Sequence, residues 1–322
     1  MSACDICGEV SGNKFHAICE MMNGVRDVFR YVECPACGCM RLENIPDNIA
    51  AYYPEDYYSF KKPDSSEDGS VESFLNRQKT LYRLGGKSII GRLLSPGKRK
   101  KIPQYINWFR RAHILFDSKI LDVGCGAGAF LLSIQKDGFR DLLGVDPYIK
   151  SDIIYDCGVK ILKKELSGLN GQFDLIMLNH SLEHMTGHFK IFEELRRLLK
   201  DSGCLLIRMP VMSSFAWREY GVNWVQCDAP RHLFLHSVKS LKILAEKCGF
   251  EVRDTVFDST EFQFWGSIQY QINIPLNDPG SYTVSPGKSI FSQDDIKKFK
   301  RRADELNKNG DGDQACFYLY KN

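Results

Sequence analysis

The sequence contains no long hydrophobic run and no strong excess of charge of one sign. None of its apolar stretches approaches the roughly 18 residues of a membrane-spanning helix, so we expect no integral membrane protein. The first ten residues, MSACDICGEV, have neither a basic start nor an apolar core, so we expect no signal peptide and a cytoplasmic protein. The 43 basic and 40 acidic residues leave a net charge of +3, which argues against a nucleic-acid or membrane-surface partner.

What remains is a globular composition. The chain has 322 residues, 43% hydrophobic and 26% charged, enough for one large core and a small additional module. Six of the twelve cysteines fall within the first 39 residues, which indicates a metal site or reduced thiols rather than disulfides. We expect a zinc-ribbon module at 1–45, an aromatic segment with a linker and helical lead-in at 46–103, and an α/β domain at 104–322.

Two cysteine pairs with the same spacing occur in the N-terminal region, in the motifs CDICG and CPACG. A C-x-x-C turn points both thiolates at one ion, and the following glycine can take the left-handed conformation that the turn tends to need. The alternatives are a redox dithiol or free thiols. The predicted ligands of a structural Zn²⁺ are Cys4, Cys7, Cys34 and Cys37. Cys19 and Cys39 are expected to be spare thiols, and four protein ligands leave no open position for catalysis.

From residue 119 onward, short apolar runs alternate with helical patterns. Seven runs are predicted strands: 119–123, 141–145, 159–162, 173–178, 204–209, 250–257 and 315–320. Helical patterns include 129–136, 188–200 and a helix that Ser237 can cap, and a basic helix is expected near 293–307. The alternation predicts an α/β fold with a parallel-rich, seven-stranded sheet and helices on both faces.

A glycine-rich turn, ILDVGCGAGAF, joins the first predicted strand to the following helix. Such a turn lets a ligand approach the backbone closely. Gly124 and Gly126, with an alanine three residues later, also fit the dinucleotide pattern, and Asp146 after the next strand suits an adenosine ribose in either case. Asp122 favours S-adenosylmethionine over NAD, because a carboxylate there faces an amino group and a positive sulfur but would repel a pyrophosphate.

The order of the motifs LDVGCGAGAF, GVDP and FDLIMLNHSLEH resembles that of the class I S-adenosylmethionine-dependent methyltransferases, over roughly residues 104–260. With the cysteine module, the segment AYYPEDYYSF and the later DAPRHLFLHS, the chain more narrowly resembles zinc-ribbon methyltransferases of sugar, capsule and antibiotic biosynthesis. The resemblance implies a Rossmann-like fold. The cofactor-binding residues that it implies are Asp122, Gly124, Gly126, Gly128, Asp146, Pro147 and Asn179.

The resemblance also implies a role for each part of this set. Asp122 and the glycine turn would hold the methionine end of the cofactor, and Asp146 would bind both ribose hydroxyls. Pro147 would border the adenine, and Asn179 the methionine carboxylate or sulfonium.

Methyl transfer to a hydroxyl or an acidic C–H also needs a base, and histidine suits that role near neutral pH. His184 follows the fourth predicted strand, and His232 lies in the long connection after the fifth. Both are catalytic candidates, and the alternative for each is that it only fixes its loop. Glu183 is expected to organise the loop rather than to act as an acid. The tyrosines of segment 52–58 could stack on a sugar or a nucleotide base, or pack between domains.

These observations predict an S-adenosylmethionine-dependent methyltransferase of polysaccharide biosynthesis that carries structural zinc. Its partner would be a small molecule, a sugar or nucleotide sugar, methylated on carbon or oxygen. Two alternatives stay open. One is a zinc-ribbon ribosomal RNA methyltransferase, against which the balanced charge argues. The other is a non-catalytic assembly module whose cofactor site only regulates binding.

Overall fold

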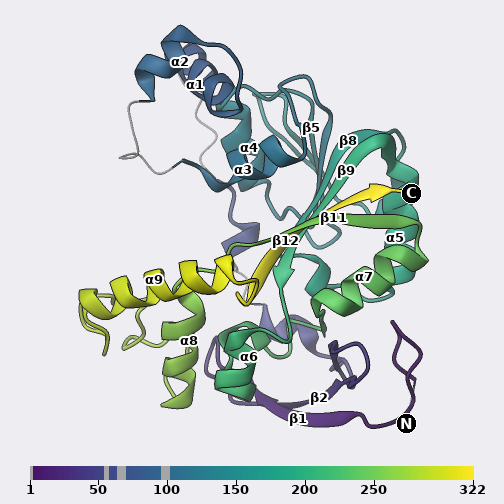
Figure 1. Cartoon of the computed structure of the whole chain (residues 1–322), viewed down its shortest axis with the longest axis vertical. Helices are drawn as coiled ribbons and strands as arrows, with labels where there is room; N and C mark the ends of the chain where they lie inside the picture. Colours follow the sequence, from purple (N-terminus) through teal and green to yellow (C-terminus); the bar gives the residue numbers. More distant parts are fainter. Residues whose placement is uncertain (1–2, 54–57, 64–69, 96–101) are drawn as a thin grey trace. The chain divides into compact units, whose positions relative to one another are not determined.

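The computed structural model describes residues 3–53, 58–63, 70–95 and 102–322 (Figure 1). Residues 54–57 and 64–69, which belong to the predicted aromatic segment and linker, lie outside the described residues. The chain divides into two compact units. The first consists of Met1–Glu55, Leu182–Phe189 and Arg208–Phe317, and the second of Asp56–Ser181, Lys190–Ile207 and Tyr318–Asn322. Each unit therefore combines segments that are far apart in the sequence.

The second unit is built on parallel strands. Its strands are β4 (Ile120–Val123), β5 (Leu142–Val145), β6 (Ile153–Ile154), β7 (Lys160–Leu162), β8 (Phe173–Asn179) and most of β9 (Leu199–Pro210). Its helices are α1 (Ser70–Arg83), α2 (Ile89–Leu94), α3 (Gln104–Arg111), α4 (Ala129–Lys136), most of α5 (His188–Leu198), η2 (Tyr58–Phe60) and η3 (Leu166–Gly168). β4 pairs in parallel with β5 and β8, and β5 with β7. All four residues of β4 are buried, as expected for a strand in a sheet covered on both faces.

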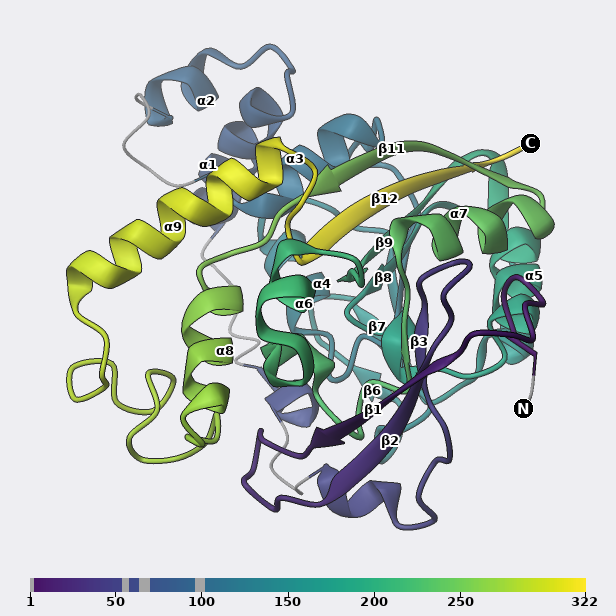
Figure 2. The same ribbon diagram turned by 60° about the horizontal axis from the view of Figure 1, so that its bottom comes forward.

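The first unit holds, among its described residues, a separate four-stranded sheet in the order β1-β2-β3-β10. Its strands are β1 (Lys14–Cys19), β2 (Val28–Glu33), β3 (Met40–Leu42) and β10 (Phe234–Leu235), all paired antiparallel. Figure 2 labels the first three of them. Tyr31, Trp224 and Leu235 are fully buried in one shared core. None of these four strands was predicted from the sequence. β3 and β10, with three and two residues, are too short for a periodic pattern, and the six-residue strands β1 and β2 were missed as well. The independent folding of residues 1–45 stays a prediction.

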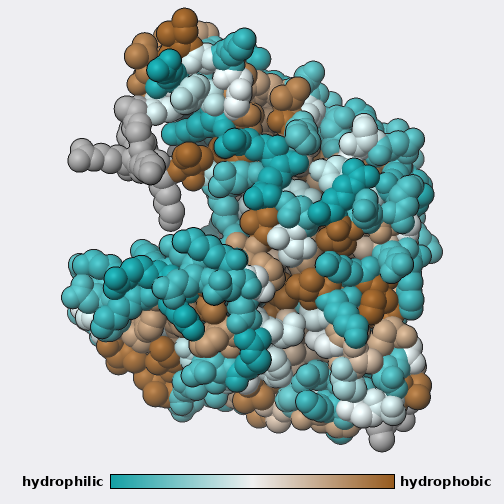
Figure 3. All heavy atoms as spheres, in the orientation of Figure 1, coloured by the Kyte–Doolittle hydropathy of each residue, from teal (hydrophilic) through white to brown (hydrophobic). Residues whose placement is uncertain are grey.

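The first unit also contains the predicted capped helix and the predicted basic helix. Its helices are α6 (Phe215–Tyr220), α7 (Val238–Lys247), α8 (Phe262–Gln271), α9 (Gln293–Lys308), η1 (Ile49–Tyr52), η4 (Leu182–His184), η5 (Gly221–Asn223) and η6 (Val225–Cys227). Ser237 caps α7 through a hydrogen bond from the Ser240 N–H, as predicted. α9 buries Ile296, Ala303 and Leu306, and its visible side is hydrophilic in Figure 3. None of the described helices combines the length and apolar character of a bilayer-spanning segment.

The predicted number of strands is wrong by one. Within the described part of the chain, the larger sheet has eight strands in the order β11-β12-β9-β8-β4-β5-β7-β6, where β11 is Phe250–Phe257 and β12 is Gln314–Lys321. The seven predicted strands are present, and the additional one is β6, which pairs antiparallel with β7. Two residues are too few to show the alternation of a strand, so only the pairing reveals β6.

Candidate functional site

The turn between β4 and α4 is held by glycines in a left-handed conformation. The φ angles of Gly124, Gly126 and Gly128 are 74°, 54° and 82°, a region that other residues enter only at a cost. A Cβ at Gly126 would lie 2.1 Å from the carbonyl oxygen of Ser59, and one at Gly128 would lie 2.5 Å from Cδ1 of Ile161. The left-handed backbone favours glycine at all three positions, and at Gly126 the nearby backbone of Ser59 also leaves no room for a side chain.

Two buried aspartates stand at the ends of neighbouring strands beside this turn. Asp122 is 4% exposed in β4, and Asp146, directly after β5, is 6% exposed. The N–H groups of Gly126 and Tyr148 donate to the two carboxylate oxygens of Asp146, each at 2.9 Å. A carboxylate oxygen can accept hydrogen bonds from more than one donor. Burial, with the nearby charge of Asp146, raises the pKa of Asp122 to about 7. A positively charged ligand would favour the ionised form of this carboxyl.

The other predicted cofactor residues lie at the same edge of the parallel strands. Asn179 is the last residue of β8 and is half-buried, and Pro147 is half-buried in the turn after β5. The Ser181 hydroxyl donates to the carbonyl oxygen of Val123 at 2.8 Å, which ties the end of β8 to the end of β4. In open α/β sheets, ligands bind outside the carboxyl ends of the strands. The residues gathered here fit a cofactor with an adenosine and a positively charged amino acid part.

The two predicted catalytic histidines lie together in the first unit. Their ring centroids are 4.8 Å apart. Nδ1 of His184 lies 2.8 Å from the carbonyl oxygen of Arg231, and Nδ1 of His232 lies 2.8 Å from that of Gln226. Because a carbonyl oxygen only accepts, both Nδ1 atoms carry the proton in the neutral rings, and each Nε2 keeps its lone pair. The sequence offered these residues as alternatives, whereas the structure makes them one pair.

Two carboxylates face this pair. Nε2 of His232 lies 4.0 Å from Oε1 of Glu183 and 3.8 Å from Oδ2 of Asp228. Burial lowers the pKa of His232 to about 4, and the neighbouring His184 adds to this effect. The ring is therefore neutral at pH 7. Burial alone would raise the pKa of Asp228, but the charge and hydrogen bonds of Arg231 help to outweigh it and lower that pKa.

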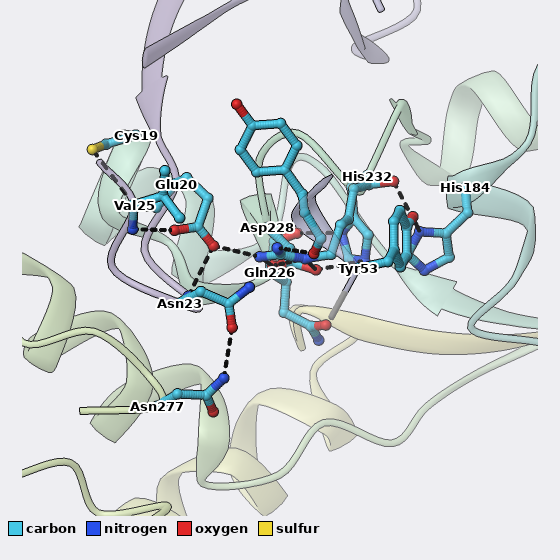
Figure 4. Close-up of polar contacts among 12 residues, drawn as sticks. Cys19, Glu20, Asn23, Val25, Tyr53, His184, Gln226, Asp228, His232 and Asn277 are labelled. Atoms are coloured by element: carbon cyan, nitrogen blue, oxygen red, sulfur yellow. Dashed lines mark hydrogen bonds and ion pairs between the residues drawn. The ribbon is translucent and has the colours of Figure 1, made fainter. Parts of the chain in front are cut away.

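A buried arginine connects this loop to the N-terminal segment, because it binds both Asp228 and Glu20, which are labelled in Figure 4. Arg231 is fully buried and donates to Asp228 at 2.6 Å, to Glu20 at 3.0 Å and to the carbonyl oxygen of Tyr52 at 3.0 Å. Glu20 also accepts two backbone N–H groups of its own turn. Sequence reasoning missed Glu20 and the role of Arg231, since nothing in the sequence links positions 211 residues apart.

Aromatic residues support the same loop. The hydroxyl of Tyr31 donates to the carbonyl oxygen of His232 at 2.8 Å, and that of Tyr53 lies 3.3 Å from Nδ1 of His184. Tyr52 is buried and packs edge-on against Phe29. The other two tyrosines of this segment, Tyr57 and the side chain of Tyr58, lie outside the described part of the chain.

The N-terminal cysteines form a cluster that fits a tetrahedral metal. The four predicted ligand sulfurs all lie within 4.8 Å of one another. Sγ of Cys4 is 3.7 Å from that of Cys37, and Sγ of Cys7 is 3.6 Å from that of Cys34. Sulfurs bound to one Zn²⁺ at about 2.3 Å would be about 3.8 Å apart. The fifth thiol, Cys39, lies 3.6 Å from Cys4 and 3.4 Å from Cys37, closer to the ligand set than predicted.

The backbone around the cluster follows the motif. Gly8 and Gly38, the glycines after the second cysteine of each pair, have φ angles of 83° and 72°, as predicted. The cluster also contacts α7 and the residue before it. Ser237 donates to the carbonyl oxygen of Cys37 at 2.5 Å, and Lys247 to that of Ile6 at 2.8 Å. The turns that carry the cysteines are thus part of the first unit's packing.

Comparisons with known proteins place the chain among methyltransferases. Human EEF1A lysine methyltransferase 2 is 30% identical over 124 residues, 32% of this chain and 51% of that protein. The tRNA U34 carboxymethyltransferase of Aeromonas salmonicida is 27% identical over 182 residues, 49% of this chain and 53% of that protein. The chain thus spans about half the length of these curated relatives.

Solved structures and a family model complete the comparison. The cyclopropane synthase MmaA2 from Mycobacterium tuberculosis matches with a TM-score of 0.43 and 15% identity, over 70% of this chain and 87% of that one. A family model described as a methyltransferase domain matches residues 87–255. Because that match covers just over half of the residues, the chain belongs to this family of methyltransferase domains.

Proposed function

We propose that the protein transfers a methyl group from S-adenosylmethionine to a hydroxyl or carbon of a sugar, in particular a nucleotide-linked sugar. The observation that carries the cofactor assignment is the buried pair Asp122 and Asp146 beside the glycine turn. A carboxylate at Asp122 attracts the amino and sulfonium groups of this cofactor, whereas it would repel the pyrophosphate of NAD. Membership of the methyltransferase family supports the same cofactor.

The proposed contacts follow from the chemistry of each group. Asp122 and the glycine turn hold the methionine end, and Asp146 accepts hydrogen bonds from the ribose hydroxyls. Pro147 borders the adenine, and Asn179 borders the methionine carboxylate or sulfonium. When bound, S-adenosylmethionine supplies a methyl group on a positively charged sulfur.

The acceptor is proposed to lose its proton at the His184–His232 pair. In the simplest form, the acceptor O–H or C–H bond breaks as Nε2 of one ring takes the proton. The oxygen or carbon forms a bond to the methyl carbon, and the electron pair of the carbon–sulfur bond stays with sulfur. The histidine then returns the proton to water, so the products are the methylated acceptor and S-adenosylhomocysteine.

A sugar acceptor is supported by the polar character of this pair. Nε2 of His232 and the nearby carboxylates of Glu183 and Asp228 are all hydrogen-bond acceptors. A ligand rich in hydroxyl donors complements such a surface. The resemblance to zinc-ribbon methyltransferases of sugar and polysaccharide biosynthesis points to the same class. The cysteine cluster is proposed to bind structural zinc only.

Calorimetry with S-adenosylmethionine tests the cofactor assignment. Asp146→Ala removes the proposed ribose contact and should weaken binding by about 2 kcal/mol, roughly thirtyfold. The exposed Asp156 in the same unit provides a matched control, and Asp156→Ala should bind as the wild type does. Tight binding of NAD that persists in excess S-adenosylmethionine would overturn the assignment.

Release of S-adenosylhomocysteine in the presence of candidate acceptors tests the substrate class. We expect release with a nucleotide-linked sugar, and a product heavier than the acceptor by one CH₂ group. Transfer RNA serves as the comparison, because one relative is a tRNA carboxymethyltransferase. Methylation of RNA with no reaction on any nucleotide sugar would contradict the sugar proposal.

A further inference from the structure

We propose that Glu183, His184 and His232 bind a divalent metal ion, and that this ion holds and activates a hydroxyl of the acceptor. The inference rests on the cofactor and the acceptor class of the proposed function, and it replaces the histidine base by an ion that the histidine pair binds. It also assigns a site to Glu183, which the sequence presented only as a loop organiser.

The first observation is the convergence of the three side chains. One ligand atom from each of Glu183, His184 and His232 lies within 4.8 Å of the others, and Oε1 of Glu183 is 4.0 Å from Nε2 of His232. Nitrogen and oxygen ligands at about 2.1 Å from one ion lie roughly 3 to 4 Å apart. Small rotations of the side chains would therefore bring all three atoms to an ion. Two histidines and one carboxylate form a common ligand set for divalent transition metals.

The second observation is how the two rings are held. Both Nδ1–H groups donate to backbone carbonyl oxygens at 2.8 Å, those of Arg231 and Gln226. Metal-binding histidines almost always donate their other ring N–H in this way, which fixes the ring orientation and leaves Nε2 as the ligand. Each of the two adjacent rings makes one such bond here, so both present the same nitrogen to a ligand.

The third observation is the character of the atoms that meet. The Nε2 lone pair of His232 faces carboxylate oxygens of Glu183 and Asp228 at 4.0 and 3.8 Å. These atoms all carry partial or full negative charge and repel one another at such distances. A cation among them converts the repulsion into attraction. Asp228, which Arg231 already binds, would add a second carboxylate close to the ion.

Three protein ligands leave open positions on the ion, as in catalytic metal sites. A hydroxyl bound there loses its proton to water more readily, because the ion stabilises the alkoxide. Two open positions would hold two neighbouring oxygens, so the inferred acceptor carries adjacent hydroxyls, as sugars do. The histidines then hold the ion rather than the acceptor's proton.

The inferred site differs in chemistry from the cysteine cluster. Thiolates select zinc and other soft ions, whereas carboxylate and imidazole also suit Mn²⁺. Binding of Mn²⁺ alone, followed by electron paramagnetic resonance, therefore probes the histidine site while zinc stays in the cluster. We expect about one bound Mn²⁺ per chain, with nitrogen hyperfine coupling from histidine and enhanced relaxation of water protons from the open positions.

Variants separate this site from other ligands. Glu183→Gln, which keeps the side-chain shape, and His232→Ala should each weaken Mn²⁺ binding at least about tenfold. His113→Asn is the matched control, since His113 is an exposed histidine that asparagine can replace at its φ of 55°. It should bind Mn²⁺ as the wild type does. Absence of Mn²⁺ binding, or binding without nitrogen coupling in the wild type, would overturn the inference even if a variant failed to fold.

Activity then distinguishes the two proposals. Enzyme stripped of the ion, with its zinc content verified by metal analysis, should lose turnover and regain it with Mn²⁺. If the stripped enzyme kept its turnover while His232→Ala still lost it, the metal site would be rejected and the histidine base would be retained. Unchanged turnover in both His184→Ala and His232→Ala would instead contradict the proposal that the acceptor reacts at this histidine pair.

Discussion

The glycine turn of the second unit and the histidine pair of the first draw on the sequence in different ways. The turn takes Asp122, its glycines and Asp146 from one continuous strand–helix–strand stretch. The histidine pair takes His184 from η4 and His232 from the connection before β10. Its supports come from a third region, because Glu20 and Tyr53 lie in the N-terminal segment.

This difference determines what a mutation can do. Contacts within one short stretch form with little loss of chain entropy, so a change at the glycine turn should alter ligand binding without disrupting the fold of the first unit. The histidine loop depends on a buried ion-pair network and a shared core, so a change there should affect both the fold of the first unit and the chemistry. Four measurements test this contrast, in order of decreasing expected effect.

Loss of the cysteine cluster should be the most severe change. Cys34→Ser or chelation should remove about one zinc per chain and unfold residues 1–45, since metal binding and folding are coupled. Because Ser237 and Lys247 donate hydrogen bonds to this region, α7 should also lose protection in hydrogen exchange. Cys157→Ser, outside the cluster, is the control. Loss of S-adenosylmethionine affinity in the same variant would contradict the idea that the glycine turn of the second unit is independent of the first unit.

Removal of the histidines should have the second-largest effect, which is on turnover. At least one of His184→Ala and His232→Ala should lower turnover by about 10²- to 10⁴-fold with nearly normal S-adenosylmethionine affinity. Because the rings are 4.8 Å apart, the double variant should be little worse than the more damaging single one. Turnover above about a tenth of the wild type in both single variants would mean that alignment alone drives the reaction.

Removal of the buried guanidinium should mainly affect stability. Arg231→Met leaves the carboxylates of Glu20 and Asp228 without their cation and should cost about 3–5 kcal/mol of unfolding free energy. Urea unfolding followed by tryptophan fluorescence, to which the buried Trp224 contributes, measures this. Arg253→Met, at an exposed pair with Glu251, should cost at most about 1 kcal/mol. Equal costs for the two variants would show that the buried network does not hold the loop.

The smallest expected effect is a pH dependence at the glycine turn. Asp122 is ionised in the unfolded chain above pH 4, but its folded pKa is about 7, so its stabilising contribution is lost as pH rises through 7. Asp122→Asn removes this loss. At pH 8 the unfolding free energy of the variant, measured in urea, should exceed that of the wild type by on the order of 2–4 kcal/mol. This difference should disappear toward pH 4. A gap independent of pH would show that Asp122 does not titrate as inferred.

Local patterns predicted much of the molecule. The seven predicted strands, the Ser237 cap of α7 and the left-handed glycines after Cys7 and Cys37 follow from residues that are neighbours in the sequence. The cysteine cluster follows equally from two repeated turns. In each case the physical cause, whether backbone conformation, capping or side-chain alternation, acts within a few residues and therefore leaves a readable pattern.

The sequence by itself determined the α/β fold, the glycine turn with its two aspartates and the candidate cysteine ligands. Only the tertiary structure decided that β6 joins the sheet, that β3 pairs with β10, and that Arg231 binds Glu20. It also decided that His184 and His232, which the sequence offered as rivals, stand side by side with Glu183. These contacts join positions tens to hundreds of residues apart, and they form because folding buries charges and apolar side chains that local propensity does not bring together.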